Sequence, residues 1–277
     1  GWAAMDVCAK IRGILKEKRV GHGGTLDPMA TGVLPVFVGQ ATRAVEFAEN
    51  GEKEYIAGLR LGLVTNTQDT SGETLETHPV TADRKALEAL LPWFTGPIQQ
   101  IPPMYSAIKI NGQKLYDLAR KGREVERAPR PVTIHALELE DQLGPDEFLL
   151  RVRCSKGTYV RTLCHDIGAA VGCGGCMSSL RRTMAAGFTL AHSVTLDTVL
   201  QAQDPAALLL PVDTYFAGYP DLVADLEQEK RIRSGAALPM PTLADGRYRV
   251  YSQDGTFLAL SQEENGILTT VKSFYEV

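Results

Sequence analysis

The 277-residue sequence lacks any apolar run that approaches the length of a membrane span, which argues against a membrane protein. It contains only five cysteines, and this odd, sparse set indicates a reducing cytosol and no disulfide framework. Internal repeats, low-complexity tracts and nucleotide-binding motifs are also missing. Its 44% hydrophobic and 22% charged residues are ordinary for a globular protein, so we expect a cytoplasmic protein with no membrane association.

An excess of positive charge is missing too, since the formal net charge is −4. This value argues mildly against a generic nucleic-acid binder, although a folded surface can gather its positive charge on one face. The stretch from Lys109 to Arg130 has seven basic and three acidic residues, a local net charge of +4. A solvated helix face and an RNA-facing edge that includes Tyr116 are both open interpretations of this stretch.

The glycine-rich stretch from Gly21 to Pro35 disfavours regular secondary structure, since it has four glycines, two prolines and one acidic residue, Asp27. Glycine permits unusual backbone angles, and proline removes an N–H donor and restricts φ. The composition alone favours a connecting loop in which Asp27 caps a turn. The alternative is a rigid loop that presents a lone carboxylate to a ligand.

The residue order of this loop separates the two interpretations. It reads Gly-His-x-Gly-Thr-Leu-Asp-Pro-x-Ala-Thr-Gly-Val-Leu-Pro from Gly21, and a Gly-Gln-Ala-Thr-Arg run that ends at Arg43 follows it. This order resembles the catalytic motif of the TruB family of tRNA pseudouridine synthases. The resemblance implies that Asp27 is the catalytic aspartate and His22 the motif histidine, which binds substrate. Gly23 stands where the family usually has threonine, and Arg43 where it usually has lysine; neither departure removes a catalytic group.

Two further segments carry the resemblance. Tyr55 lies on an alternating strand predicted for Glu54–Leu61, where ordinary core packing is the simplest interpretation. The resemblance instead aligns Tyr55 with the tyrosine that the family stacks under its target base. It also implies that Tyr159 and Arg161 line the active site, with the arginine paired to the catalytic carboxylate. A surface salt bridge is the alternative for Arg161, whereas an arginine beside a buried acid would keep that acid ionised, as a nucleophile requires.

A third segment follows a Cys-Gly-Gly-Cys run that ends at Cys176. Leu180 matches an apolar residue that packs near the target base in the family. The next two residues, Arg181 and Arg182, are open to two interpretations: phosphate contacts or salt bridges. The Cys-Gly-Gly-Cys run has too few ligands at suitable spacing for zinc, so a glycine-rich turn is expected and no metal site.

The resemblance covers residues 2–213 and implies an α+β pseudouridine synthase fold, a mixed and largely antiparallel sheet with flanking helices. We expect residues 1–213 to form the catalytic domain, with the strand that usually opens the family missing from this sequence. Residues 214–277 resemble a small β-rich, PUA-like RNA-binding domain. The patterns predict helices at 4–16, 81–94, 195–202 and 227–235, and strands at 36–38, 54–61, 131–140, 147–154, 248–250, 256–261 and 268–272.

The implied reaction converts uridine to pseudouridine at position 55, in the T loop of tRNA. The reaction adds no atoms to the base, so no cofactor is expected, and one carboxylate is enough if it attacks the nucleoside and then leaves. Whether that carboxylate attacks C1′, attacks C6 or drives a glycal route stays open. The expected partner is the tRNA T stem-loop, bound by a monomer without an obligatory protein partner, and a tRNA-folding chaperone role can coexist with catalysis.

Three competing functions share parts of this pattern. A guide-RNA-dependent relative would contain the same Asp27 motif but would need protein partners and a guide. A pure RNA chaperone would act without the Asp27 carboxylate. A nucleoside hydrolase would release free uracil, although glycoside hydrolysis normally uses a second carboxylate, and the loop has none.

Overall fold

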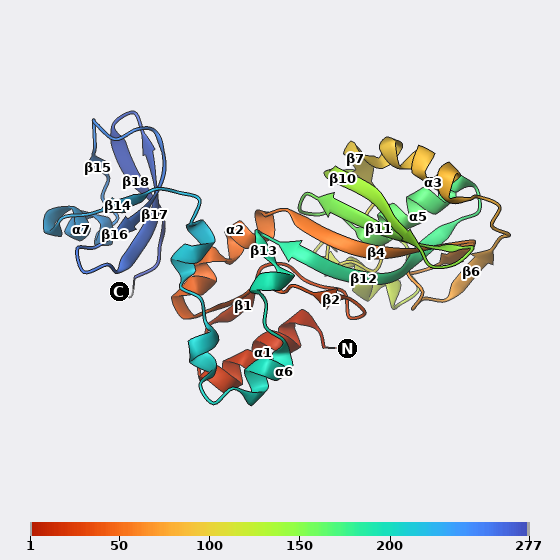
Figure 1. Ribbon diagram of the computed structural model, residues 1–277, viewed down its shortest axis with the longest axis horizontal. Helices are drawn as coiled ribbons and strands as arrows, with labels where there is room; N and C mark the ends of the chain where they lie inside the picture. The colour runs from red at the N-terminus through yellow and green to blue at the C-terminus, as the bar shows by residue number, and fades with distance from the viewer. Residues whose placement is uncertain (1, 276–277) are drawn as a thin grey trace. The chain divides into compact units, whose positions relative to one another are not determined.

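A computed structural model describes residues 2–275 of the chain. Contacts divide these residues into two compact units, which we describe separately. The first unit consists of residues 26–33 and 50–193, and the second of residues 2–25, 34–49 and the described chain from residue 194 onward. The sequence predicts a boundary between two consecutive domains at residue 213. The two contact-based units are not consecutive in sequence, so this boundary stays a prediction. Figure 1 shows the described residues and labels many of the helices and strands.

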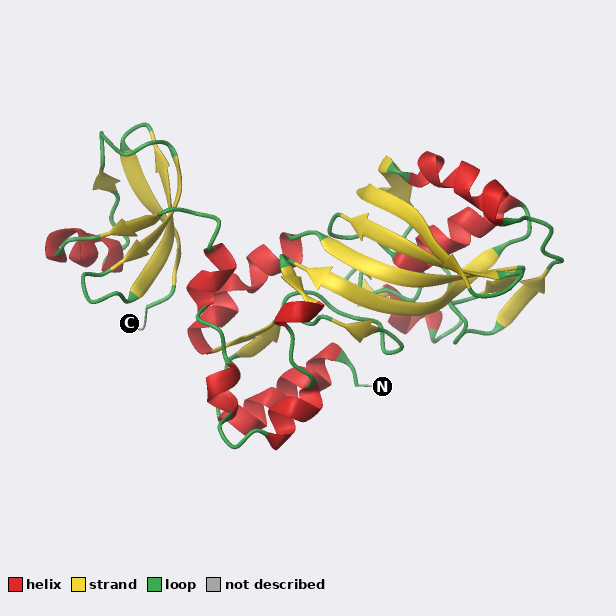
Figure 2. Ribbon diagram, in the orientation of Figure 1, coloured by secondary structure: helices red, strands yellow, loops and turns green. Residues whose placement is uncertain are grey.

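A seven-stranded sheet forms the frame of the first unit (Figure 2). The strand β2 (Thr31–Gly32) pairs with β12 in parallel, and the other pairings of this sheet are antiparallel. This arrangement confirms the predicted α+β class and the mixed, largely antiparallel sheet. The remaining strands, in spatial order, are β13 (Phe188–Thr189), β12 (Gly175–Ala185), β4 (Lys53–Leu61), β11 (Glu147–Cys154), β10 (Arg130–Gln142) and β7 (Gly96–Gln100).

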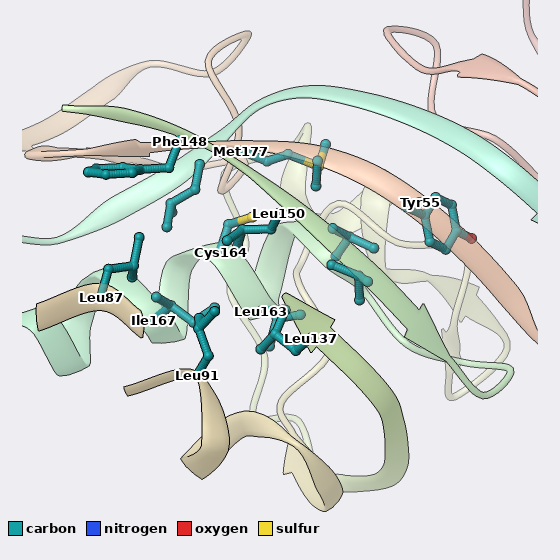
Figure 3. Close-up of a cluster of buried hydrophobic side chains, with 14 of the residues drawn as sticks. Tyr55, Leu87, Leu91, Leu137, Phe148, Leu150, Leu163, Cys164, Ile167 and Met177 are labelled. Atoms are coloured by element: carbon teal, nitrogen blue, oxygen red, sulfur yellow. The ribbon is translucent and has the colours of Figure 1, made fainter. Parts of the chain in front are cut away.

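The core of this unit lies between one face of the sheet and the helices α3 (Arg84–Leu90) and α5 (Val160–Val171) (Figure 3). The alternation predicted for β4 is confirmed, because Tyr55, Leu59 and Leu61 are buried on that face. Side chains of β11 and α5 meet them there, so two elements that follow β4 by more than 80 residues in sequence form a single core with it. The partners from these two elements are Phe148, Leu150, Val152, Leu163, Cys164 and Ile167.

The helix predicted from Thr81 begins later than expected. Asp83 caps α3, and its carboxylate accepts a hydrogen bond from the Ala86 N–H at 2.9 Å. Asp83 lies directly before the first helical residue, where a side-chain oxygen can satisfy the free N–H groups of the first turn. The helix then tightens into the 3-10 turn η2 (Leu91–Phe94), since Pro92 has no N–H to continue the α-helical ladder.

Several short elements of the first unit lie outside its main sheet. The hairpin of β5 (Leu63–Thr65) and β6 (Thr74–Thr77) encloses the polar turn 66–73. A second hairpin, β8 (Lys109–Ile110) and β9 (Gln113–Lys114), leads directly into α4 (Leu115–Ala119). A 3-10 turn, η3 (Leu190–His192), follows β13 at the end of this unit.

The second unit contains α1 (Ala4–Leu15), the predicted N-terminal helix, and a five-stranded sheet near the C-terminus. The sheet order is β14 (Asp221–Val223), β16 (Gly246–Tyr251), β17 (Phe257–Glu264), β18 (Ile267–Ser273) and β15 (Leu238–Pro239). The helix α7 (Leu226–Arg233), which the sequence predicts at 227–235, packs on this sheet through Ile232. The other elements of this unit are β1 (Val20–His22), β3 (Val36–Val38), η1 (Gly39–Ala44), α2 (Val45–Asn50), α6 (Leu196–Gln201), η4 (Pro205–Leu208) and η5 (Val212–Phe216).

The prediction that residues 21–35 contain no regular strand is wrong at both ends. The backbone of Gly21 and His22 continues β1 and pairs with β3, and Thr31–Gly32 forms β2. Glycine has no Cβ, so it tolerates the close approach of a neighbouring strand. The prediction treated glycine only as a residue that disfavours strands. Among the described residues, no helix has both the length and the apolar character needed to cross a membrane.

Candidate active site

The Asp27 segment is anchored to the first unit on its C-terminal side. The Ala30 N–H donates to the Asp27 carbonyl at 2.9 Å and closes a turn directly after the aspartate. The chain then enters β2, which pairs with β12. Asp27 therefore sits on a short tethered turn, and 34% of its side chain is exposed.

Arg161 lies in the first turn of α5 and points at Asp27. Its Nε donates to Asp27 Oδ2 at 3.0 Å, and its Nη2 donates to Asp27 Oδ1 at 3.2 Å. Only 8% of the arginine side chain is exposed. A two-point contact between a guanidinium and a carboxylate fixes the orientation of both groups as well as their distance. The predicted site residues Asp27 and Arg161, 134 residues apart in sequence, are thus in direct contact.

Backbone carbonyls from two other segments complete the surroundings of Arg161. Its Nη1 donates to the Thr67 carbonyl at 3.2 Å, and its Nη2 donates to the Tyr105 carbonyl at 3.0 Å. A buried guanidinium is tolerated when its N–H groups have acceptors. The arginine therefore cannot swing away from Asp27 without losing bonds to both segments.

A second carboxylate, Asp69, also approaches Arg161. Its Oδ2 lies 3.8 Å from Arg161 Nη1, and only 7% of its side chain is exposed. Its Oδ1 accepts bonds from Thr67 Oγ1 at 2.7 Å and from the Ser71 N–H at 3.0 Å. The turn that carries Asp69 is held against β12, because the Met177 N–H donates to the Gln68 carbonyl at 2.9 Å. Arg161 therefore lies between an accessible and an inaccessible carboxylate.

Tyr55 lies on β4, at one end of the core cluster, and its phenol oxygen points away from the other labelled side chains (Figure 3). Only 9% of the residue is exposed. Burial raises the pKa of Tyr55 to about 12, and the charge on Asp27 adds a smaller contribution in the same direction. The hydroxyl is therefore protonated at neutral pH, and it can donate a hydrogen bond.

Tyr159 and Leu180 lie in the same unit. Leu180 is buried in the core cluster that contains Tyr55. Tyr159 directly precedes α5, and the buried Gln100 side chain binds its backbone at two points, accepting from the Tyr159 N–H at 3.0 Å and donating to its carbonyl at 3.2 Å. Burial raises the pKa of the Tyr159 hydroxyl, and the Arg161 charge lowers it. Gln100 thus fixes the start of the helix that carries Arg161.

His22 belongs to the second unit, where it ends β1 and pairs with Val36. Its role at the site therefore stays a prediction. Arg43 lies in the same unit, and its Nη1 donates to the Ser273 carbonyl at 3.0 Å and to Ser273 Oγ at 2.6 Å. The positive charge that replaces the usual lysine therefore has an acceptor near the C-terminal end of the chain.

No metal site emerges from the residues that the structure describes, since no three His, Cys, Asp or Glu side chains among them are placed to share an ion. All five cysteines are buried free thiols. Cys173 lies in the predicted turn, whereas Cys176 is already part of β12. Burial raises the pKa of Cys176 to about 11, so this thiol is protonated at neutral pH.

Comparison with known families places this geometry in context. A sequence model of TruB family pseudouridylate synthase (N terminal domain) matches residues 12–160. A model of the tRNA pseudouridylate synthase B C-terminal domain matches residues 161–217. The chain belongs to the TruB family. The family predicted from the sequence motifs is thereby confirmed.

Relatives in this family match nearly the whole chain. A protein named tRNA pseudouridine synthase B from Clostridium kluyveri is 39% identical over 279 residues, which cover 99% of this chain and 96% of that protein. Proteins of the same name from Burkholderia lata and an Azoarcus species are each 45% identical; both alignments cover 97% of this chain, and they cover 85% and 89% of those proteins.

Solved structures share the fold. A crystal structure of a Cbf5–Nop10–Gar1 complex contains a chain that matches with a TM-score of 0.72 and 24% identity, over 99% of this chain and 82% of that one. An H/ACA RNP bound to a substrate RNA containing 2′-deoxyuridine matches with a TM-score of 0.67 and 23% identity, over 100% and 82% of the two chains. At this identity the likeness shows a common pseudouridine synthase fold.

Sequence reasoning missed two residues of the site. The sequence predicts no function for Asp69 or for Gln100. Neither position has a local signal, because each acts on a segment at least 59 residues away. Only their burial, which the fold creates, separates them from ordinary turn and strand residues.

Proposed function

We propose that this TruB family protein isomerises uridine to pseudouridine at position 55, in the T loop of tRNA, with Asp27 as the nucleophile. The observation that carries the proposal is the two-point contact of the buried Arg161 guanidinium with the Asp27 carboxylate, which keeps part of its surface accessible. The relatives named tRNA pseudouridine synthase B support tRNA as the substrate.

The reaction breaks two bonds and forms two. The bond from ribose C1′ to uracil N1 breaks, the base rotates, and C1′ joins C5; the proton on C5 then leaves to solvent, and N1 takes up a proton. Asp27 would attack the nucleoside at C1′ or C6, or act in a glycal route, and would be released at the end. Arg161 would hold the carboxylate in the orientation needed for attack, since positioning of a reactive group supplies much of a catalytic rate.

The target uridine has to leave its RNA stack to reach Asp27. Tyr55 and Leu180 would hold the extruded base, and the protonated Tyr55 hydroxyl would donate to the sugar or the base. Tyr159 would border the same pocket beside Arg161. His22 would contact the space that the base vacates in the RNA.

Basic side chains suited to RNA phosphate gather in the same unit. Tyr105, whose carbonyl binds Arg161, begins a segment that continues through β8, β9 and α4. Lys109, Lys114, Arg120 and Lys121 line a hollow of about 500 Å³ there. Lys114 Nζ and the Arg120 guanidinium lie 5.2 and 5.4 Å from the centre of the Tyr116 ring. We propose that this hollow, formed by the basic stretch noted in the sequence, binds the tRNA backbone.

Release of tritium from [5-³H]uridine-labelled tRNA tests the activity. The isolated chain should release tritium from an unmodified tRNA transcript, without a guide RNA or a protein partner, and should not release it when residue 55 is a cytidine. Asp27→Asn should abolish release and leave tRNA binding nearly intact. Turnover by Asp27→Asn would refute the assignment, and free uracil in the chromatogram would point to a hydrolase.

A tRNA-folding role rests on a separate observation. The basic hollow contains no residue of the Asp27–Arg161 contact, so RNA binding there does not require the carboxylate. We propose that Asp27→Asn protein still promotes folding of a misfolded tRNA transcript. Native-gel analysis of annealed and misfolded tRNA tests this role, and loss of the effect together with tritium release would limit the protein to catalysis.

A further inference from the structure

Among residues 2–275, Arg182 is the largest of the side chains that are less than 2% exposed. It lies on β12, two residues after Leu180, and only 1% of it is exposed. This burial rules out a phosphate contact at the surface, one of the two sequence interpretations of the Arg181–Arg182 pair. Burying a guanidinium is unfavourable unless its N–H groups find acceptors, so the partners of Arg182 indicate what the residue does.

One set of partners belongs to the chain that leads away from Asp27. Arg182 Nε donates to the Val33 carbonyl at 2.8 Å, and the Val33 N–H donates to the Arg182 carbonyl at 2.8 Å. Between them and Asp27 lies Gly32, whose φ is +102° and where a Cβ atom would come within 2.1 Å of the Arg182 carbonyl oxygen. Both the backbone and the side chain of Arg182 therefore hold the end of the Asp27 segment.

Tyr55 is the cross-strand neighbour of Arg182. Arg182 and Tyr55 are directly opposite each other in the pairing of β12 with β4. The positive charge of Arg182 lowers the pKa of the Tyr55 phenol, against the larger effect of burial. Since a guanidinium has only donors, it can bind the phenol oxygen only as a donor, and the phenol then keeps its own hydrogen to donate elsewhere.

We propose that Arg182 is a positioning residue that holds the Tyr55 phenol oxygen and the Val33 carbonyl at the same time, and thereby sets the Tyr55 hydroxyl relative to the Asp27 segment. The proposal rests on the proposed isomerase function, in which the Tyr55 hydroxyl and the Asp27 carboxylate both face the extruded uridine. The planar guanidinium can reach two acceptors in fixed directions, and a lysine ammonium at this position cannot reproduce that fork.

Single-turnover tritium release by Arg182→Lys tests the positioning role. We expect the rate to fall by about 10- to 100-fold, since displacement of reacting groups by about an ångström has effects of that size. The tRNA Kd should stay unchanged, because Arg182 is buried. The matched control is Arg153→Lys on the exposed side of β11, which should leave the rate unchanged. An unchanged rate in Arg182→Lys would overturn the proposal.

A double-mutant cycle separates positioning from general structural support. If Arg182 acts through the phenol, Arg182→Lys should lower the rate much less in a Tyr55→Phe background than in the wild type. A residue that merely stabilises the sheet would give additive effects, and that result would also overturn the proposal. An inactive wild-type protein would instead reject the isomerase function, so the two failures are distinguishable.

Thermal melting of Tyr55→Phe covers the case in which Arg182→Lys does not fold. Loss of the phenol oxygen would leave the buried guanidinium without one acceptor, so we expect the Tm to fall by about 2–4 °C. If the guanidinium does not bind the phenol, replacing a buried hydroxyl with hydrogen would leave the Tm unchanged or raise it, and the proposal fails.

Discussion

Two of the arginine–carboxylate networks in the first unit differ in their surroundings. On β11, Arg153 donates to Glu52 Oε2 at 2.6 and 2.8 Å, and Arg151 pairs with Glu54 and Glu140. The side chains of Arg151 and Arg153 are 37% and 51% exposed, and within residues 2–275 their side chains bind only other side chains. Arg161 has similar distances to Asp27, but it is buried and also binds two backbone carbonyls.

The comparison shows that distance alone does not identify a functional ion pair. An exposed pair is screened by water and can rearrange, so it contributes little to stability or geometry. A buried ion pair whose arginine also binds backbone carbonyls is held in one arrangement. Removing either partner leaves the charge of the other group buried without an opposite charge beside it. The four predictions below test this difference, and they run from the largest expected effect to the smallest.

Arg161→Met should have the largest effect. The Asp27 carboxylate would lose both hydrogen bonds that orient it, so we expect single-turnover tritium release to fall by at least about 10³-fold. The free energy of unfolding should fall by about 3 kcal/mol, at the lower end for a broken buried pair because Asp27 is partly exposed. Urea denaturation measures the stability, and Arg153→Met is the matched control. A similar loss in both variants would show that burial does not matter.

Asp69→Asn should have an intermediate effect. The substitution keeps the size of the side chain but removes the second negative charge near Arg161, whose guanidinium would then be held less firmly. We expect single-turnover tritium release to fall by about 10- to 100-fold with unchanged tRNA affinity. Glu73→Gln, on the exposed part of the same turn, should leave the rate at the wild-type level. Equal rates in the two variants would show that Asp69 does not contribute to the function of the site.

Tyr55→Phe should change the pH dependence of stability. Burial raises the pKa of Tyr55 from 10.0 to about 12, so the folded protein keeps the phenol proton that the unfolded chain loses above pH 10. The contribution is fully present below pH 10 and is lost between pH 10 and 12; at pH 11 the loss is about 1.4 kcal/mol. Urea denaturation at pH 8 and pH 11 should show a smaller decrease for Tyr55→Phe than for the wild type. Equal decreases would place the phenol in contact with water.

Arg153→Ala should have the smallest effect. The side chain is 51% exposed and its partner Glu52 is 43% exposed, so we expect the free energy of unfolding to change by less than about 1 kcal/mol. Raising the ionic strength should reduce even this change. The tritium-release rate should equal that of the wild type. A loss of activity would show that the exposed network takes part in tRNA recognition.

The strands were predictable because their signal is local. Alternation on β4 and β11 follows from the sequence, since residues two apart on a strand share one face. The same rule could have identified Arg182 as buried, because it lies two residues after Leu180 on β12. The two sequence interpretations of this arginine, a phosphate contact or a salt bridge, use only its charge and not its position in the pattern.

The composition of the glycine-rich stretch predicted an irregular segment, but it did not predict that part of this segment pairs as a strand. Composition indicated a loop, whereas Gly32 lies in β2 because its missing Cβ lets the backbone of Arg182 approach. Family motifs identified Asp27 and Arg161 as partners, and no periodicity or spacing could have done so. The cap of α3 lies two residues later than Thr81, because two residues close in sequence, Thr81 and Asp83, can each cap a helix.

The sequence alone determined the family, the alternating strands and the identity of the candidate nucleophile, because short motifs and two-residue periodicity are local properties. The tertiary structure decided which charges are buried. The buried charged side chains differ from the exposed arginines of β11 in the segments packed around them, and those segments come from distant parts of the chain. The buried side chains are Arg161, Asp69 and Arg182. Exclusion of water gives these charged groups a single arrangement, and no local pattern encodes it.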